Sequence, residues 1–306
     1  MAFDAVLLIA FGGPTRPEEI RPFLANVTRG RRIPPERLEV VAHHYQQIGG
    51  RSPLNALTFR QADGLRRTLA DAGVALPVYV GMRNWEPYLA DVLAEMAGAG
   101  VRRALGLILS PHASEASRER YIEAVDAGRA ALGARAPEIV YAPTWHVHPR
   151  FVEAVAAETG TALGTLPAER RAAAALVFTA HSIPTAMAAT APYTTELAAS
   201  ATAVTRALGR DAHLLAYQSR SGSPREPWLE PDVNDLLRTL AARGIRDVVV
   251  VPIGFVCDHV EVLYDLDVEA AATARSLGIR FARARAVNDH PAFIAMLADV
   301  VRRAAT

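Results

Sequence analysis

Short apolar runs alternate with longer amphipathic segments along most of this chain. Several of the runs, such as LGLIL and DVVVVPI, are apolar at nearly every position, which is typical of strands buried on both faces of a parallel sheet. The amphipathic segments between the runs have the length that a crossover helix needs. The pattern predicts an α/β fold with strands at Ala5–Ala10, Val78–Met82, Ala104–Leu109, Glu138–Tyr141, Ala174–Thr179, His213–Tyr217, Asp247–Val251 and Arg280–Arg285.

Eight strands that alternate with helices fit either a (β/α)₈ barrel or two open sheets. An internal echo favours two sheets, because AFGGPT from Ala10 and AHSIPT from Ala180 each follow an apolar strand directly. The third strand of each half also ends at a proline, Pro111 and Pro252. The first half is longer between these echoes, which we attribute to an insertion over residues 17–53. Two open sheets that face each other would bring their strand ends into one cleft.

The stretch PIGFVCDHVEVLYDLDVEAA, which begins at Pro252, leads from a buried strand into a run of acidic residues. Glu261, Asp265 and Glu269 recur every four residues, so on a helix they form a ladder of carboxylates along one face. No Arg or Lys lies between Cys257 and Ala274 to relieve the repulsion within this ladder. One interpretation is a solvated acidic face near a helix start, where carboxylates suit the helix dipole. The other is a path for a divalent cation, since such metals bind carboxylate oxygen and imidazole nitrogen.

A histidine stands at the end of another predicted strand, in the sequence FTAHSIP. The neutral imidazole of His181 can take a proton or bind a metal, although a histidine at a strand end is more often structural. The strand that leads to Glu261 ends at the same mouth of the predicted cleft, so His181 and the ladder can converge there. A proton acceptor beside a carboxylate-lined path therefore predicts a site that handles a metal and protons together.

Composition and charge exclude several classes of function. The chain has 306 residues, of which 51% are hydrophobic, and this is enough for two domains with separate cores. The apolar run near the N-terminus is short, follows Asp4 and has no basic flank, so we expect neither a signal peptide nor a membrane span, and we expect a cytoplasmic protein. The formal net charge of +1 gives no broad positive field for nucleic acid. Neither a dinucleotide-binding glycine motif after a strand nor a Walker loop is present, which disfavours ATP-driven chemistry.

Seven fragments together resemble the ferrochelatase family from end to end, in the order typical of that family. They are LLIAFGGP, YQQIGGRSPL, GMRNWEP, LSPHAS, FTAHSIP, YQSRSGSPREPWLEPDV and PIGFVCDHVEVLYDLDVE. The resemblance implies two Rossmann-like, chelatase-type halves, each a four-stranded parallel sheet flanked by helices, at residues 1–144 and 145–289. It also implies that a C-terminal helix, 290–306, packs back on the first half. The implied reaction is the insertion of ferrous iron into a porphyrin.

The same resemblance assigns roles to the residues already singled out. His181 matches the catalytic histidine of the family and Glu261 its paired glutamate, while Asp265 and Glu269 match the acidic ladder that leads from that glutamate. We therefore expect all four side chains to contact the metal on its way to the ring. Removal of two pyrrole protons needs a base, which His181 supplies. Removal of water from Fe²⁺ needs replacement ligands, which the ladder supplies.

The short form of the chain, without a C-terminal membrane-associating extension, is similar to the bacterial enzymes that use coproporphyrin III. Arginines in the insertion and in the GRSPL loop, Arg29, Arg31 and Arg51, offer forks for propionate groups, although a solvated basic loop explains them equally well. Phe11 stands where several relatives have a tyrosine, and we expect it to pack on the macrocycle. His44 stands where some relatives have an arginine. The porphyrin-binding residues that we predict are Phe11, Arg29, His44, Arg51, Ser52 and Tyr121.

Cofactors and partners follow from the cysteine count and from the resemblance. Some family members hold a [2Fe–2S] cluster on four cysteines, but Cys257 is the only cysteine of this chain, so we expect no iron–sulfur cluster. We also expect no tightly bound cofactor, with Fe²⁺ as a substrate. The expected partners are the porphyrin and ferrous iron, with transient contacts to other enzymes of the haem pathway. Nothing in the pattern suggests a coiled coil or an obligate interface, so we expect a monomer.

Three alternatives remain open from the sequence. The first is use of protoporphyrin IX in place of coproporphyrin III. The second is a chelatase of the same architecture that acts on another tetrapyrrole, such as cobalt insertion into sirohydrochlorin, although those enzymes are typically built around paired histidines. The third is a haem or metal carrier, which needs the same apolar cleft and ligands but performs no catalysis.

Overall fold

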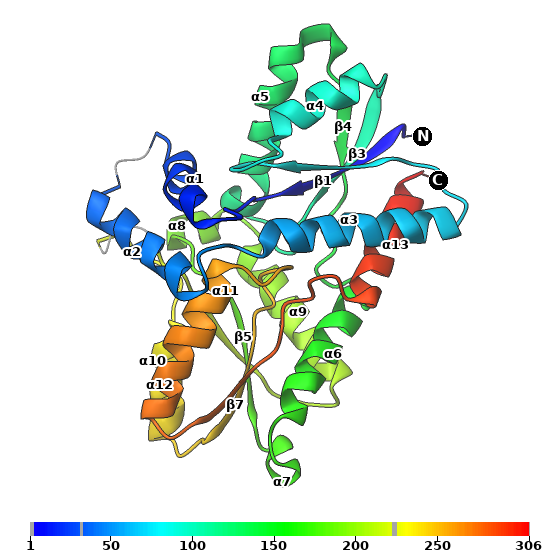
Figure 1. Ribbon diagram of the computed structural model, residues 1–306. Coiled ribbons are helices and arrows are strands. Elements are labelled where there is room, and N and C mark those ends of the chain that lie inside the picture. Colours follow the sequence, from blue (N-terminus) through cyan, green and yellow to red (C-terminus); the bar gives the residue numbers. More distant parts are fainter. Residues whose placement is uncertain (1–2, 31–32, 222–224, 306) are drawn as a thin grey trace. The chain divides into compact units, whose positions relative to one another are not determined.

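The computed structural model describes residues 3–30, 33–221 and 225–305 (Figure 1). Within these residues the chain forms two four-stranded sheets in which every strand pair is parallel. The first sheet contains β1 (Ala5–Ala10), β2 (Val78–Met82), β3 (Arg103–Ile108) and β4 (Glu138–Tyr141). The second contains β5 (Ala175–His181), β6 (Leu214–Gln218), β7 (Asp247–Val251) and β8 (Arg280–Arg283). The predicted α/β fold with two parallel sheets is confirmed, and the barrel is wrong.

The two sheets share one topology. Their strand orders are β2-β1-β3-β4 and β6-β5-β7-β8, so the second half of the chain repeats the connections of the first. In each sheet the chain moves from the first strand to one side and then to the other, and the carboxyl ends of the two central strands form a topological switch point. Each half also has a π-helical turn after its third strand, at Glu115–Glu119 and Asp265–Ala270. The echoes in the sequence therefore reflect a repeated structural unit.

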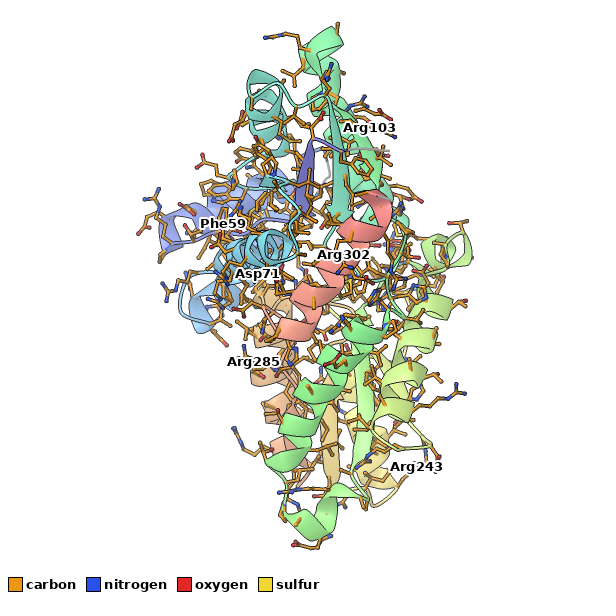
Figure 2. The ribbon with its side chains drawn as sticks, turned by 90° about the vertical axis from the view of Figure 1, so that its right-hand side faces the viewer. Phe59, Asp71, Arg103, Arg243, Arg285 and Arg302 are labelled. Atoms are coloured by element: carbon orange, nitrogen blue, oxygen red, sulfur yellow. The ribbon has the colours of Figure 1, made fainter. Side chains whose placement is uncertain are left out.

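The first compact unit comprises residues 1–110, 116–144 and 289–306. Its α-helices are α1 (Ile20–Val27), α2 (Pro35–Gln47), α3 (Leu54–Asp71), α4 (Leu89–Gly98), α5 (Arg120–Leu132) and α13 (Pro291–Ala305). The last of these packs across α3, as Figure 2 shows near Asp71 and Arg302. Gly64 of α3 makes this approach possible, because a Cβ atom there would lie 3.1 Å from side-chain atoms of Ile294.

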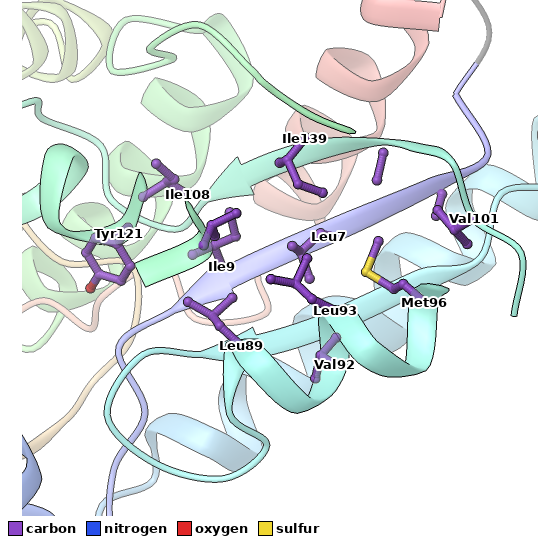
Figure 3. Packing of buried hydrophobic residues seen from close by; sticks show 13 residues of the cluster. Leu7, Ile9, Leu89, Val92, Leu93, Met96, Val101, Ile108, Tyr121 and Ile139 are labelled. Atoms are coloured by element: carbon purple, nitrogen blue, oxygen red, sulfur yellow. The ribbon is translucent and has the colours of Figure 1, made fainter. Parts of the chain in front are cut away.

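The core of the first unit lies between the sheet and the pair of helices α4 and α5 (Figure 3). Leu7 and Ile9 of β1 pack with Leu89, Leu93 and Met96 of α4 in this cluster, and all five are buried. Every residue of β1 is buried, since helices cover both faces of a parallel sheet. This explains why the strand is a continuous apolar run in the sequence.

The second compact unit comprises residues 111–115 and 145–288. Its α-helices are α6 (Pro149–Gly164), α7 (Ala168–Arg171), α8 (Thr185–Ala189), α9 (Tyr193–Ala207), α10 (Val233–Ala242), α11 (Val260–Tyr264) and α12 (Ala271–Ser276). Val248 and Val250 of β7 pack in its core with Leu237 of α10 and with Leu266 and Ala270 of the π-helical turn. Among the described residues of both units, no helix has the length and apolarity needed to cross a membrane.

Candidate active site

His181 is the last residue of β5, and hydrogen bonds hold the backbone on both sides of it. The hydroxyl of Tyr193 donates to the carbonyl oxygen of His181 at 2.8 Å, and the Ser182 N–H donates to the carbonyl oxygen of Gln218 at the same distance. The imidazole Nδ1 lies in close contact with the carbonyl oxygen of Ser182. Because a carbonyl only accepts, this contact assigns the proton to Nδ1 and leaves the lone pair on Nε2. The histidine is thus oriented as a base through Nε2.

Glu261 lies in α11, after the neighbouring strand β7, and its carboxylate faces Nε2 of His181. Its Oε1 lies 3.7 Å from Nε2 of His181, and its Oε2 lies 3.4 Å from Nε2 of His259. The segment after β7 reaches the end of β5 because residue 254 is a glycine whose N–H donates to Thr179 at 3.0 Å. A Cβ atom at Gly254 would lie only 2.5 Å from Cβ of Ala180. The structure thus brings together the two residues that the sequence predicted to converge.

The first two acids of the ladder differ in their electrostatic environment. Burial works to raise the pKa of Glu261, but the positive charge that His181 carries when it is protonated, together with the hydrogen bond and charge of His259, lowers the pKa to about 2. Burial raises the pKa of Asp265 to about 8, helped by the charges of Glu261 and Glu269 and opposed by a hydrogen bond from Ser219. Glu261 therefore favours its charged form, whereas the site favours the protonated form of Asp265 until a cation lies beside it.

The ladder lies along a helix, as predicted, but the helix is not α-helical throughout. The chain forms α11 up to Tyr264 and then a π-helical turn over Asp265–Ala270. A spacing of four residues exceeds one turn of an α-helix, about 3.6 residues, but falls short of one turn of the wider π-helix. Going from Glu261 to Asp265 therefore overshoots a full turn about the helix axis, and going from Asp265 to Glu269 falls short of one. The two angular offsets partly cancel. The three acids stay on one side of the helix, with Asp265 half-buried and Glu269 exposed.

The four predicted metal-contacting side chains are not assembled as a closed metal site. Among the described residues, no group of three or more His, Cys, Asp or Glu side chains is close enough to hold an ion. The structure brings His181 and Glu261 together, and it places Asp265 and Glu269 farther along the helix. That all four contact the metal remains a prediction.

Three polar residues of this site were missed by the sequence analysis. His259 contacts the second oxygen of Glu261. Gln218, the last residue of β6, donates through Nε2 to the carbonyl oxygen of Glu261 at 2.6 Å. The next residue, Ser219, has a positive φ of 63° and donates its hydroxyl to Asp265. In the sequence, Gln218 and Ser219 stand out as two polar residues directly after the predicted strand that ends at Tyr217, and this pattern could have identified them as site residues.

Comparison with known proteins decides the family to which this site belongs. The Ferrochelatase family model matches residues 3–305. The chain belongs to the ferrochelatase family. Two curated relatives are each 46% identical to it, the coproporphyrin III ferrochelatases of Nocardia farcinica, over 99% of this chain and 88% of the relative, and of Mycolicibacterium smegmatis, over 98% and 89%. Of the solved structures, SirB from Bacillus subtilis with Fe³⁺ has a TM-score of 0.61 at 12% identity, over 99% of this chain and 95% of that chain, which shows the shared fold.

The first unit holds the porphyrin-binding residues that we predicted for this member of the ferrochelatase family. Phe11, directly after β1, stacks edge-on against Phe23 of α1, with ring centroids 6.3 Å apart. Ser52 is buried, its N–H donates to Pro14 at 2.8 Å, and its hydroxyl accepts from the Leu54 N–H at 3.3 Å. The structure thus places Phe11 and Ser52 beside the loop that follows β1. The Ser52 hydroxyl also shapes the start of α3.

Tyr121 belongs to the core of the first unit. It is buried, and the guanidinium of Arg83 lies 5.6 Å from the centroid of its ring. Its ring packs in the cluster around β1 and α4. That Tyr121 contacts a porphyrin stays a prediction.

The predicted basic groups differ in their surroundings. Arg29 is exposed and donates to the side chain of Asn26 at 2.7 Å, and Arg51 is also exposed. His44 of α2 is half-buried, and burial together with the charges of Arg37 and His43 lowers its pKa to about 4. A neutral His44 can exchange a hydrogen bond with a carboxylate but adds no charge near pH 7. Arg31 lies outside the described residues.

Proposed function

We propose that this chain inserts ferrous iron into coproporphyrin III and forms coprohaem in haem synthesis. The observation that carries the proposal is the His181–Glu261 pair, with 3.7 Å between Nε2 and Oε1, in a chain of the ferrochelatase family. The choice of porphyrin is supported by the relatives, which are 46% identical over nearly the whole chain and are coproporphyrin III ferrochelatases.

Proton removal is the task of His181. Metallation of a free-base porphyrin releases two pyrrole protons, and the partly exposed imidazole of His181 takes them one after the other, passing the first to water before it takes the second. The contact of Nδ1 with the Ser182 carbonyl keeps Nε2 available as the acceptor. The charged carboxylate of Glu261 then stabilises the imidazolium that forms, because the two groups are 3.7 Å apart.

Iron delivery is the task of the acidic ladder. Fe²⁺ arrives with bound water, and each water that it loses must be replaced by an oxygen or nitrogen ligand. Exposed Glu269 and half-buried Asp265 offer such oxygens in succession before Glu261. The metal thus exchanges its water in steps rather than in one costly event.

Porphyrin binding is the task of the first unit. A free-base ring is flat, and rigid walls that hold it distorted favour the metallated geometry. We assign the walls to Phe11, Tyr121 and the loop of Ser52. Arg29, Arg51 and His44 are assigned to the propionates, of which coproporphyrin has four and protoporphyrin two.

The remaining parts of the proposal concern cofactors and surroundings. We propose that no resident cofactor takes part and that no iron–sulfur cluster forms, since Cys257 is the only cysteine of the sequence. We also propose a monomer in the cytoplasm that meets other enzymes of the haem pathway only transiently.

The experiment that tests the proposal is an anaerobic assay with ferrous iron, followed by the absorption bands of the porphyrin. A carrier would bind the porphyrin without turnover, whereas the proposed enzyme converts it. Coproporphyrin III should be preferred over protoporphyrin IX by about tenfold or more in kcat/KM, because a polar group left unpaired costs about 1–3 kcal/mol. An equal or higher kcat/KM with protoporphyrin IX would contradict the assignment of coproporphyrin III as the substrate.

A variant sharpens this test. Arg29→Ala should reduce kcat/KM for coproporphyrin III more than for protoporphyrin IX. Arg67→Ala is the matched control, since it removes an exposed arginine of α3 that we do not assign to the porphyrin. An equal loss with both porphyrins would mean that Arg29 only stabilises the loop.

A further inference from the structure

A single arginine binds both ends of the segment that carries the first two acids of the ladder. Arg283, the last residue of β8, donates to Asp267 of the π-helical turn in a two-point fork, with Nε–Oδ1 at 2.8 Å and Nη2–Oδ2 at 2.5 Å. Its third nitrogen, Nη1, donates to Oδ1 of Asp258 at 2.7 Å. Glu261 and Asp265 lie between these two aspartates.

The Asp258 end of this arrangement is rigid. Its side chain is 12% exposed, and that of Arg283 is 11% exposed. Asn288 donates to Oδ2 of Asp258 at 2.8 Å and accepts from its N–H, also at 2.8 Å. The N–H of Ala286 donates to Oδ1 at 3.2 Å. The guanidinium of Arg283 therefore connects the π-helical turn to a buried, hydrogen-bonded aspartate.

The π-helical turn needs such support. A π-turn is rare and is less favourable than a continuous α-helix, so it persists where surrounding contacts determine it. Asp267 lies between Asp265 and Glu269, and a shift of two residues along a helix points to the opposite side. Arg283 thus holds the side of the turn away from the ladder. A return to α-helical winding would rotate Asp267 out of the fork and change the direction of Asp265 and Glu269 relative to Glu261.

We propose that Arg283 is a positioning residue for the metal path, which fixes the π-helical turn so that Asp265 and Glu269 align with Glu261. The inference rests on the proposed function, because it assumes that iron travels along these acids. Arg283 contacts neither substrate nor reacting atoms in this scheme. It acts through Asp258 and Asp267.

Arg283→Lys is the decisive variant because it keeps the charge. An ammonium can stay paired with Asp258, but it lacks the planar fork that spans two carboxylates. Arg280→Lys is a matched control, since Arg280 lies on the same strand and makes a similar two-point contact with Asp247, at 2.5 and 3.1 Å. Both variants leave the net charge unchanged, so a difference between them reports geometry.

We expect Arg283→Lys to raise the KM for Fe²⁺ by about tenfold, as for a group that orients a metal ligand, while kcat at saturating iron and the KM for porphyrin stay near wild type. Arg280→Lys should leave all three constants near wild type. An unchanged KM for iron in Arg283→Lys, or an equal rise in Arg280→Lys, would overturn the inference. Thermal unfolding of each variant shows that the comparison is made on folded protein.

A second substitution covers the case in which Arg283→Lys does not fold. Asp267 is 39% exposed, so Asp267→Asn breaks the fork at a position that tolerates change. Its control is Asp235→Asn on α10, which removes the same charge from an exposed pair with Arg238. A rise in KM for iron confined to Asp267→Asn supports the inference, and equal values for the two variants contradict it.

Metal binding without turnover separates this inference from the proposed function. Co²⁺ affinity of the porphyrin-free protein, measured by calorimetry, should be weaker by about tenfold in Arg283→Lys than in Arg280→Lys. If the wild type fails to metallate any porphyrin, the proposed function falls, and the Co²⁺ comparison still tests the inference. If the wild type turns over and the Co²⁺ affinities are equal, the inference alone falls.

Discussion

Oε1 of Glu261 lies 3.7 Å from Nε2 of His181, although 80 positions separate the two residues in the chain (261 − 181). They meet because β5 and β7 are neighbours in the sheet, so the segments that follow their carboxyl ends share one edge. A base and a carboxylate in this arrangement form one unit, in which the carboxylate stabilises the protonated base.

Replacement of His181 by alanine should nearly abolish metal insertion while porphyrin still binds. General acid–base groups contribute about 10²–10⁴ to the rate, so kcat should fall by that order. Anaerobic turnover and porphyrin titration measure the two effects separately. His213→Asn, at the amino end of β6 in the same sheet, should keep near-wild-type turnover. More than about a tenth of wild-type turnover in His181→Ala would remove it from this role.

The acids of the ladder should differ in the kinetic constant that they affect. Glu261→Gln should lower kcat strongly because it removes the charge beside His181. Asp265→Asn and Glu269→Gln should act mainly on the KM for iron, because they stand farther along the helix. Initial rates over a range of Fe²⁺ concentrations distinguish the two cases. A larger loss at saturating iron in Glu269→Gln than in Glu261→Gln would mean that the path does not end at Glu261.

Gly254→Ala should destabilise the second unit and displace the segment that leads to Glu261. The added Cβ would lie 2.5 Å from Cβ of Ala180, and overpacking of this kind typically costs about 1–3 kcal/mol. Gly160→Ala in α6 is the control, because its added Cβ meets no atom within 4 Å, and it should raise stability by up to about 1 kcal/mol. Urea unfolding measures both. Equal free energies of unfolding for Gly254→Ala and the wild type would show that the loop can move away from β5 at no cost.

Stability should fall with decreasing pH because of His112, a buried residue that plays no part in the proposed reaction. Burial, with a smaller contribution from the charge of His146, lowers the pKa of His112 from 6.5 to about 3. Below pH 6.5 the unfolded chain binds a proton that the folded chain refuses, so unfolding becomes easier as the pH falls towards 3. The slope from this residue approaches about 1.4 kcal/mol per pH unit.

Urea unfolding at several pH values between 7 and 4 measures this slope in the wild type and in His112→Gln. The variant should show a shallower dependence, whatever its absolute stability, because the group that titrates only in the unfolded chain has been removed. The same slope in both proteins would show that His112 gains its proton in the folded state.

The sequence by itself determined the sheets and the central pair of the site. The strands β1, β2, β4 and β7 begin and end at the predicted residues. The signal is clearest in β1 and β7, where every position is buried and the sequence is almost continuously apolar. The repeated motifs indicated two sheets of one topology. Given that topology, the strand order brings the carboxyl ends of β5 and β7, which lead to His181 and Glu261, to one edge. The ends of the other four strands were less well predicted. For example, β5 extends to His181, because its pairing with β6 continues to that residue.

Only the tertiary structure decided how the ladder is wound and held. The four-residue spacing predicts a helix, but it does not tell an α-turn from a π-turn, because both place residues four apart on one side and differ only in how far the helix turns between them. The choice depends on contacts from remote positions, with Arg283 bonded to Asp267 16 positions away and Ser219 bonded to Asp265 46 positions away. Local spacing determines which side chains share a helix face, whereas the winding of that helix depends on hydrogen bonds to residues far away in the sequence.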